Sequence, residues 1–199
     1  VVIHEIFGLS TWVRGVADQL AADGFIAVAP DLLSRVRGGP SADELKSDSA
    51  TKLIRTVNVA EMNKGVFAAA QYGLSLPAAK KKYGVVGYCW GGSATFNHAV
   101  FNGKHFGGGV VYYGTSAAKD SMPRIQAPVL GLYGGNDARV NATIGWADTT
   151  MKALKKKYDY KVFDGAGHGF LRAQDQPANL EAARQAWPMT IAFFKKNLK

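Results

Sequence analysis

The chain has 199 residues, 47% of them hydrophobic, and a formal net charge of +9. This length and composition fit a single globular domain over residues 1–199 with a sizeable core. No apolar stretch approaches the ~18 residues needed to cross a bilayer, so neither an integral membrane protein nor a membrane partner is expected.

The basic charge raises the question of nucleic-acid binding. Three lysine runs stand at 80–82, 155–157 and 195–196. Each falls at or near the end of a predicted helix, where lysines complement the helix dipole and stay solvated. Because no DNA- or RNA-binding motif accompanies them, we expect no nucleic-acid partner. The charge would still attract anionic substrates at low salt.

Cys89 is the only cysteine of the chain. It cannot form an internal disulfide, so the fold does not depend on an oxidising compartment. We expect a cytoplasmic protein, or a periplasmic one if a signal peptide precedes this sequence. A monomer is the favoured oligomeric state.

The beginning of the chain alternates between apolar runs and an amphipathic segment. Residues 1–6 predict a short strand, and residues 11–23 predict a helix. Ser10 is a suitable N-cap for this helix and Gly24 a suitable stop. Residues 25–29 predict a second buried strand.

The rest of the chain continues the alternation of strands and helices. Residues 33–40 predict a loop, and Ser41-Ala42-Asp43-Glu44 has the spacing of a capping box, which opens a broken helical region to about residue 72. Further strands are predicted at 85–88, 110–113, 129–133 and 160–163, and further helices at 92–100, 142–156 and 179–197. Short apolar strands between longer helices predict an α/β fold with a mostly parallel sheet, helices on both faces and no large cap domain.

Cys89 lies in Gly87-Tyr88-Cys89-Trp90-Gly91-Gly92, directly after an apolar run. This is the strand, sharp turn and helix of a nucleophile elbow, with sulfur in place of the more common hydroxyl. Glycines flank the nucleophile because a Cβ there would collide with the neighbouring strand and helix. A buried cysteine without a chemical role would not require such a turn.

Three other strand ends carry residues that suit the same chemistry. Glu5 closes the first strand, Asp137 follows Gly134-Gly135-Asn136, and His168 lies in Gly165-Ala166-Gly167-His168-Gly169. The carboxyl ends of parallel strands meet at one edge of the sheet, so these side chains are expected to gather there. The order of nucleophile, acid and histidine is that of the α/β-hydrolase triad.

Each candidate has a physical task. A thiol needs a base or a cation beside it to attack a carbonyl well, which His168 would supply, while Asp137 would fix the histidine tautomer. The backbone N–H groups of Trp90 and Ile6 are the expected oxyanion donors. Asp31 and Asp164 also end strands and remain less favoured candidates for the acid. We interpret the other histidines as structural or solvated, namely His4, His98 and His105.

Taken together, these motifs and Glu5-Ile6-Phe7-Gly8 resemble the dienelactone hydrolase (carboxymethylenebutenolidase) family over essentially the whole chain. The resemblance implies a triad of Cys89, Asp137 and His168 that opens enol-lactones such as 4-carboxymethylenebut-2-en-4-olide to maleylacetate. It also implies that Glu5 meets the thiol at rest and accepts its proton when substrate binds. No metal and no organic cofactor are implied. The strands that usually precede Glu5 in the family are not part of this sequence.

The resemblance further implies a cation for a substrate carboxylate. Arg172 matches one of the two substrate-binding arginines of the family. The second has no clear counterpart: residues 42–52 offer Lys46 and Ser49, while Arg35, Arg37 and Arg55 lie at uncertain registers. One fewer charge-assisted contact would weaken the preference for an anionic substrate. The alternatives to a lactonase are therefore a broad carboxylesterase on the same triad and a binding protein without catalytic activity.

Overall fold

The fold is known from a computed structural model that describes residues 1–41, 45–101 and 103–199. Five parallel strands form one sheet in the order β1-β2-β3-β4-β5, so that sequence order and spatial order coincide. The strands span β1 (Val2–Ile3), β2 (Tyr83–Tyr88), β3 (Phe106–Tyr112), β4 (Val129–Asn136) and β5 (Tyr158–Gly167). A parallel sheet is what the alternation of strands and helices predicts.

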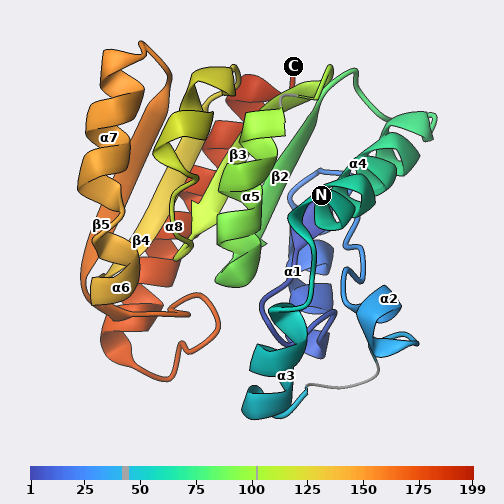
Figure 1. Cartoon of the computed structure of the whole chain (residues 1–199), viewed down its shortest axis with the longest axis horizontal. Helices are drawn as coiled ribbons and strands as arrows, with labels where there is room; N and C mark the ends of the chain where they lie inside the picture. Colours follow the sequence, from blue (N-terminus) through green and yellow to red (C-terminus); the bar gives the residue numbers. More distant parts are fainter. Residues whose placement is uncertain (42–44, 102) are drawn as a thin grey trace.

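Helices cover both faces of this sheet (Figure 1). One face packs against α4 (Val59–Ser75), α5 (Trp90–Phe101) and α7 (Ile144–Ala153), and the other against α1 (Thr11–Ala22) and α8 (Pro177–Asn197). Neighbouring strand residues alternate between the two cores, Val85 and Val111 to the first, Val86 and Val110 to the second. Since both faces are buried there, β1, β2 and β3 are apolar throughout, whereas β5 at the edge of the sheet carries exposed Asp159 and Lys161.

Helix α1 illustrates how local sequence sets an element. The Ser10 hydroxyl accepts a hydrogen bond from the Val13 backbone N–H at the N-terminus of the helix. Val13, Val16 and Leu20 form the buried stripe, at helical spacing. Gly24 follows the helix with φ +93°, a conformation that favours glycine. The prediction for this segment is confirmed to within a residue.

Three of the predicted segments take a different form. Residues 25–29 are not a strand, because the only ladder bond they make to β1 runs from the Val2 N–H to the Val28 carbonyl (2.9 Å). The predicted loop at 33–40 contains the short helix α2 (Ser34–Arg37), and Gly38 ends it in the left-handed conformation. The predicted helix at 142–156 is α7 alone, which is shorter at both ends, and the short helix α6 (Ala138–Asn141) precedes it and was not predicted.

The long helical region after Ser41 consists of α3 (Ser47–Ile54) and α4. The predicted capping box ends at Glu44, which lies outside the described residues. Its first residue, Ser41, donates its hydroxyl to the Asp31 carboxylate (3.0 Å) instead. None of the helices in the described ranges is both long and apolar enough to cross a membrane.

Candidate active site

Cys89 occupies the sharp turn between β2 and α5. Its φ of +57° is in the left-handed region, which costs a non-glycine residue about 1–2 kcal/mol. Its backbone N–H donates to the Tyr112 carbonyl (3.1 Å), which ties the turn to β3. A Cβ on Gly87 would overlap the carbonyl of Gly91, and one on Gly91 would overlap the carbonyl of Ile3. The glycines are therefore required by the close approach of α5 to the sheet.

Strand register explains which side chains meet at this edge. Strands β4 and β5 pair Asn136 with Gly167, so the next residues, Asp137 and His168, leave the sheet side by side. Strands β2 and β3 pair Tyr88 with Tyr112, which places Cys89 beside Tyr113 in the same way. All these residues stand at the carboxyl ends of the strands, where the loops of a parallel sheet converge.

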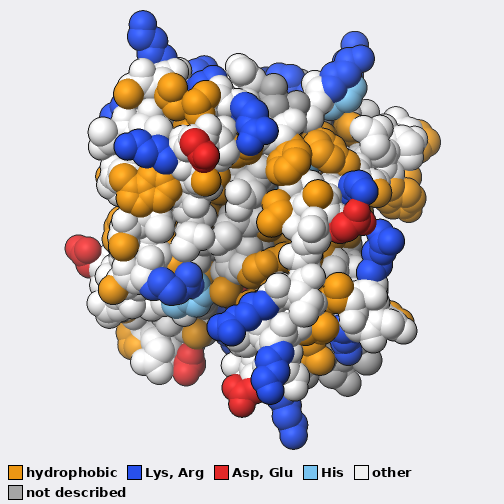
Figure 2. Space-filling view, in the orientation of Figure 1, with side chains coloured by type: hydrophobic (Ala, Val, Ile, Leu, Met, Phe, Trp, Pro, Cys, Tyr) orange, Lys and Arg blue, Asp and Glu red, His pale blue; other side chains and the backbone are white. Residues whose placement is uncertain are grey.

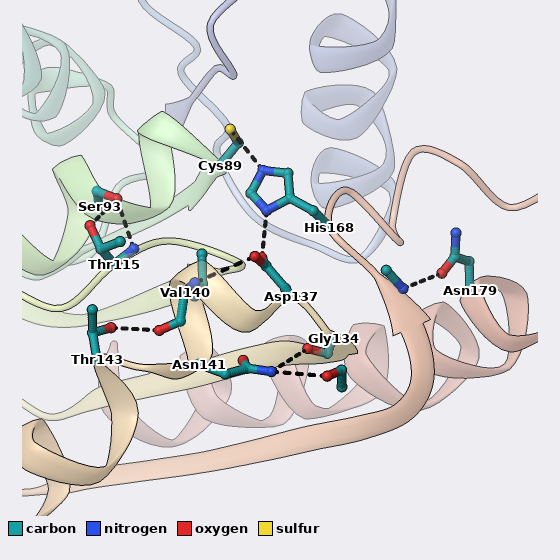
Figure 3. A network of polar contacts seen from close by, with 12 residues as sticks. Cys89, Ser93, Thr115, Gly134, Asp137, Val140, Asn141, Thr143, His168 and Asn179 are labelled. Atoms are coloured by element: carbon teal, nitrogen blue, oxygen red, sulfur yellow. Dashed lines mark hydrogen bonds and ion pairs between the residues drawn. The ribbon is translucent and has the colours of Figure 1, made fainter.

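The structure brings Cys89, His168 and Asp137 into one hydrogen-bonded row (Figure 3). The Nε2 atom of His168 lies 3.0 Å from the Cys89 Sγ, and Nδ1 lies 2.5 Å from Oδ2 of Asp137. A carboxylate can only accept, so Nδ1 carries a proton and donates it to Asp137. Nε2 then faces the sulfur as an acceptor for the thiol proton.

Asp137 is held by the turn that it begins. Its Oδ1 accepts from the Val140 N–H at the start of α6 (3.4 Å), and its side chain is buried. The Asn141 side-chain amide donates to the carbonyls of Gly134 (2.9 Å) and Gly135 (3.2 Å), which closes the same turn (Figure 3). The carboxylate therefore has little freedom to leave His168.

His168 is held by a loop that is anchored on α8. The Gly167 N–H before it donates to the Asn179 side chain (2.8 Å), as Figure 3 shows. Gly169 after it has φ +77°, so the chain turns sharply at this point. The His168 side chain is 35% exposed, whereas that of Asp137 is 6% exposed, so the imidazole forms the border between solvent and the buried acid.

The surroundings of Cys89 keep its sulfur protonated at neutral pH. Burial raises the pKa of the thiol to about 11, and the negative charge of Glu5 adds to this effect. A hydrogen bond from the Trp90 N–H and the charge of Arg139 lower the pKa but do not offset the first two causes. The resting group is therefore a thiol that donates to His168.

Glu5 and Arg172 form an ion pair between the loop after β1 and the loop before α8. Arg172 donates its Nε–H to Oε2 of Glu5 (2.8 Å), and its guanidinium stacks over the Phe7 ring at 5.5 Å. Glu5 is buried, whereas the Arg172 side chain is 39% exposed. The cation therefore stands between a buried carboxylate and solvent.

The two predicted oxyanion donors follow β2 and β1, which are neighbours in the sheet. Trp90 is the first residue of α5, and its N–H points at Cys89 Sγ. Its indole ring stacks on the His4 ring at 5.6 Å and packs partly into the core. Ile6 lies in the turn after β1, which the Gly8 N–H closes on the Glu5 carbonyl (3.5 Å).

The competing histidines and acids have other partners. His4 is fully buried between the Glu5 carbonyl and the Leu32 N–H, and His98 contacts the Tyr83 hydroxyl and the Asn63 side chain. Asp31 accepts from Ser41 and from the Leu33 N–H. Asp164 is exposed on β5. His105 is partly exposed, and its carbonyl accepts from the Tyr83 N–H.

The candidates for a second substrate-binding cation are dispersed. Arg35 forms an exposed ion pair with Glu61 (3.1 Å). Lys46 and Arg55 stand at the two ends of α3, and Ser49 lies within this helix. Arg37 is on α2. None of these side chains has a contact with Cys89 or His168 among the described residues.

Two residues near the sulfur were not singled out from the sequence. Arg139 lies two positions after Asp137 and acts electrostatically on the thiol. Tyr113 packs its ring edge-to-face against His168, with a centroid distance of 5.2 Å. A signal existed for both, because Tyr113 is the last residue of the strand predicted at 110–113 and Arg139 follows the strand predicted at 129–133, at the edge that carries the other candidates.

A cavity of about 370 Å³ lies away from this site. Its lining includes the beginning of β2, residues 25–28 and the end of α8, so it opens at the amino ends of the strands. Within the described ranges, no group of three or more His, Cys, Asp and Glu side chains is placed to hold a metal ion.

A parallel sheet with helices on both faces and a left-handed cysteine turn at a strand end defines the class of the protein as an α/β-hydrolase fold. The sequence profile of the dienelactone hydrolase family matches residues 1–198. The chain belongs to this family, whose members act as hydrolases on lactone or ester substrates.

Individual relatives agree with this assignment. A protein of Methylorubrum extorquens with the provisional name carboxymethylenebutenolidase is 30% identical, over 98% of this chain and 70% of its own length. A Saccharolobus solfataricus protein with the same provisional name is 27% identical, over 98% and 88%. A crystal structure from Klebsiella pneumoniae, provisionally titled a dienelactone hydrolase, superposes with a TM-score of 0.86 at 26% identity, over 98% and 85%.

Proposed function

We propose that this protein opens a small lactone or ester through an acyl-enzyme on Cys89, with His168 as base and Asp137 as the group that orients it. The observation that carries the proposal is the row of contacts from Sγ to Nε2 (3.0 Å) and from Nδ1 to the Asp137 carboxylate (2.5 Å). The left-handed turn at Cys89 supports it, because backbone strain of this kind clusters at functional sites.

The first step is the conversion of the thiol into a thiolate. In the resting state the nearby Glu5 carboxylate disfavours the thiolate. When a substrate draws Arg172 away from Glu5, the carboxylate loses a cationic partner and becomes a better base. The S–H group of Cys89 turns from His168 to Glu5, the S–H bond breaks as an O–H bond forms on Glu5, and the thiolate that results turns back towards His168.

The thiolate then attacks the carbonyl carbon of the substrate. The negative oxygen accepts hydrogen bonds from the backbone N–H groups of Trp90 and Ile6. When this intermediate collapses, the ring or ester C–O bond breaks, and the proton taken by Glu5 returns to the leaving oxygen. A thioester on Cys89 remains.

Water completes the cycle. Nε2 of His168 takes a proton from a water molecule, whose oxygen attacks the thioester carbon, and Cys89 leaves as the thiolate. Asp137 stabilises the imidazolium through Nδ1–H. The imidazolium proton then returns to the sulfur.

Replacement of the nucleophile tests the proposal. Cys89→Ala is expected to abolish hydrolysis of p-nitrophenyl acetate, and Cys89→Ser to reduce it, because a hydroxyl at this position is less acidic than a thiol. Burst kinetics would follow acyl-enzyme formation, and circular dichroism would verify folding. A Cys89→Ala protein that keeps its hydrolytic rate would refute the mechanism.

We further propose that Arg172 selects an anionic substrate. Arg172 is partly exposed and is paired with the buried Glu5 carboxylate. These two features support a cation that can leave Glu5 and bind the carboxylate of a substrate. Arg172→Ala should raise KM for 4-carboxymethylenebut-2-en-4-olide about tenfold, through loss of a charge-assisted contact, with a smaller effect on p-nitrophenyl acetate. Arg184→Ala on α8 is the control.

A broad carboxylesterase on the same triad is the second candidate. The observation that favours it is that the other predicted cations are dispersed, so a substrate carboxylate would have one arginine where the resemblance implies two. If Arg172→Ala changes turnover of the lactone and of the acetate ester equally, this second function replaces the first.

A further inference from the structure

Tyr113 combines several unusual features at the edge of the candidate site. It is the first residue after β3, and its backbone φ is +38°. Among the described residues, positive φ at a non-glycine occurs at Cys89, Tyr113 and Lys155. Because Tyr88 pairs with Tyr112, Tyr113 and Cys89 leave adjacent strands side by side, and both do so in a strained conformation.

The Tyr113 hydroxyl is buried without a hydrogen bond. The residue is 0% exposed, and within the described part of the chain its hydroxyl has no partner. The ring contacts His168 at 5.2 Å and Phe170 at 5.3 Å, so the side chain is firmly packed. Burial of an unsatisfied hydroxyl destabilises a fold, and such groups call for an explanation.

Glu5 lies beside the same segment as Tyr113, since its Oε1 is 4.0 Å from the position of a Cβ on Gly169, between the two residues, His168 and Phe170, that the Tyr113 ring contacts. Burial is the main cause that raises the pKa of Tyr113 well above its usual value, and Glu5 is the largest electrostatic contributor, with Cys89 also acting on it. Tyr88 has a second unpartnered hydroxyl under the influence of Glu5. Tyr113 differs from Tyr88 in its contact with His168 and in its strained backbone.

We propose that Tyr113 is a positioning residue for Glu5 in the state in which Arg172 has turned to the substrate. This inference rests on the proposed function. In that state the S–H bond of Cys89 has broken and Glu5 carries the proton as a neutral acid. The new O–H group of Glu5 donates to the phenolic oxygen of Tyr113, which replaces the hydrogen bond lost from Arg172. The hydroxyl is thus unpartnered only in the resting state.

Two adjacent tyrosines provide a matched test. The Tyr112 hydroxyl is bonded to Thr190 (2.6 Å), so Tyr112→Phe should destabilise the fold and leave the chemistry of Cys89 unchanged. Tyr113→Phe removes an unpartnered hydroxyl, so its free energy of unfolding in urea should be equal to or higher than that of the wild type.

The chemical readout is alkylation of Cys89 by iodoacetamide at pH 7 in an Arg172→Met background, where the ion pair between Arg172 and Glu5 is absent. There, Tyr113→Phe should slow alkylation about tenfold, since the protonated Glu5 loses its acceptor, and Tyr112→Phe should change it less than about twofold. In the presence of Arg172, both substitutions should have little effect. If Arg172→Met does not fold, Arg172→Ala serves as the background.

The inference is overturned if Tyr113→Phe leaves alkylation unchanged in the Arg172→Met background, or if Tyr88→Phe gives the loss in its place. It is also overturned if Tyr112→Phe slows alkylation as much as Tyr113→Phe. Hydrolysis by Cys89→Ala, measured alongside, separates the two failures. If this variant is inactive, only the role of Tyr113 is wrong, and if it is active, the proposed function has failed as well.

Discussion

At the scale of single residues, the charge state of Cys89 is set by residues that follow other strands. Burial and Glu5 raise the pKa of its thiol, while Arg139 lowers it. Cys89 follows β2, Glu5 follows β1 and Arg139 follows β4, so these effects add only when the strands are assembled. The reactivity of the sulfur therefore depends on the fold as a whole.

The resting thiol should react slowly with iodoacetamide at pH 7. A folded pKa of about 11 means that the thiolate fraction, and with it the alkylation rate, grows roughly tenfold per pH unit up to that value. A rate that reaches its plateau near pH 8 would contradict this environment. The alkylation rate at each pH is measured by quenching the reaction at set times and determining the labelled fraction by mass spectrometry.

Substitution of Arg139 tests whether its positive charge lowers the pKa of the Cys89 thiol. Removal of its positive charge in Arg139→Gln should raise the thiol pKa further and slow alkylation at pH 8. Arg184→Gln, an exposed arginine on α8, is the matched control and should leave the rate unchanged. Equal rates for all three proteins would show that Arg139 does not act on the sulfur.

Glu5→Gln should separate reactivity from catalysis. Loss of the negative charge lowers the thiol pKa, so alkylation at pH 7 becomes faster than in the wild type. Hydrolysis of 4-carboxymethylenebut-2-en-4-olide becomes slower, because the amide cannot take the thiol proton. A variant in which both rates move in the same direction would argue against Glu5 as the proton acceptor.

At the scale of elements, the contact between α5 and the strands determines whether the cysteine turn can form. Thr95 donates its hydroxyl to the Gly91 carbonyl, and Ser93 donates its backbone N–H to the carbonyl of Cys89. These bonds fix the first turn of α5 directly after the cysteine turn. Glycine is needed where the backbones meet, at Gly91 against β1 and at Gly92 against the Tyr112 carbonyl of β3.

Gly91→Ala should therefore destabilise the protein by about 3 kcal/mol, because the new methyl overlaps backbone carbonyls that cannot move. Gly15→Ala is the opposite case. It lies exposed inside α1 with open space around its Cα, and should stabilise the protein by about 0.5–1 kcal/mol. Urea unfolding of the two variants tests the pair, and similar values for both would contradict it.

Helices and strands were predictable where the local sequence pattern of apolar and capping residues matches the tertiary contacts that the segment makes. The strands after residue 80 and α1 match their predictions for this reason. The strand predicted at residues 25–29 does not form, because apolar composition does not create hydrogen bonds, and β1 makes a single backbone bond to this segment, from the Val2 N–H. The helix predicted at 142–156 is shorter than expected, since the Thr143 hydroxyl bonds back to the Val140 carbonyl in the turn that separates α6 from α7.

At the scale of the whole molecule, the buried His98, which lies between α4 and α5, makes the stability of the fold depend on pH. Its Nδ1–H donates to the Asn63 oxygen (2.9 Å), and its Nε2 accepts from the Tyr83 hydroxyl (2.9 Å), so the neutral ring is fully satisfied. Burial lowers the pKa of His98 to about 4. In the unfolded chain the pKa of this histidine is about 6.5, so below that pH the unfolded state binds more protons than the folded state.

The stability that His98 contributes is complete above pH ~6.5 and is lost as the pH falls towards 4. Between pH 7 and pH 5 the wild type should lose about 2 kcal/mol of unfolding free energy through this group. His98→Leu should reduce that loss, whatever its absolute stability, and His105→Gln should not. Urea unfolding at the two pH values measures the difference, and an unchanged pH dependence in His98→Leu would exclude the role.

The site was only partly predictable for a related reason. Cys89, Asp137 and His168 each follow a recognisable strand end, and the parallel sheet brings such ends together. The Glu5–Arg172 pair joins residues 167 positions apart, and the unpartnered Tyr113 hydroxyl is visible only after all neighbours are packed. Neither local pattern nor composition contains that information.

The cavity opens at the amino ends of the strands, whereas Cys89 follows the carboxyl end of β2, and Val86, the lining residue nearest to it along this strand, is three residues or about 10 Å away. A compound that fills it would stabilise the native state by mass action and raise the melting temperature. It would not compete with a lactone. Thermal-shift screening of this protein will therefore find ligands that leave turnover intact, and hits must be sorted by competition with substrate before they are regarded as inhibitors.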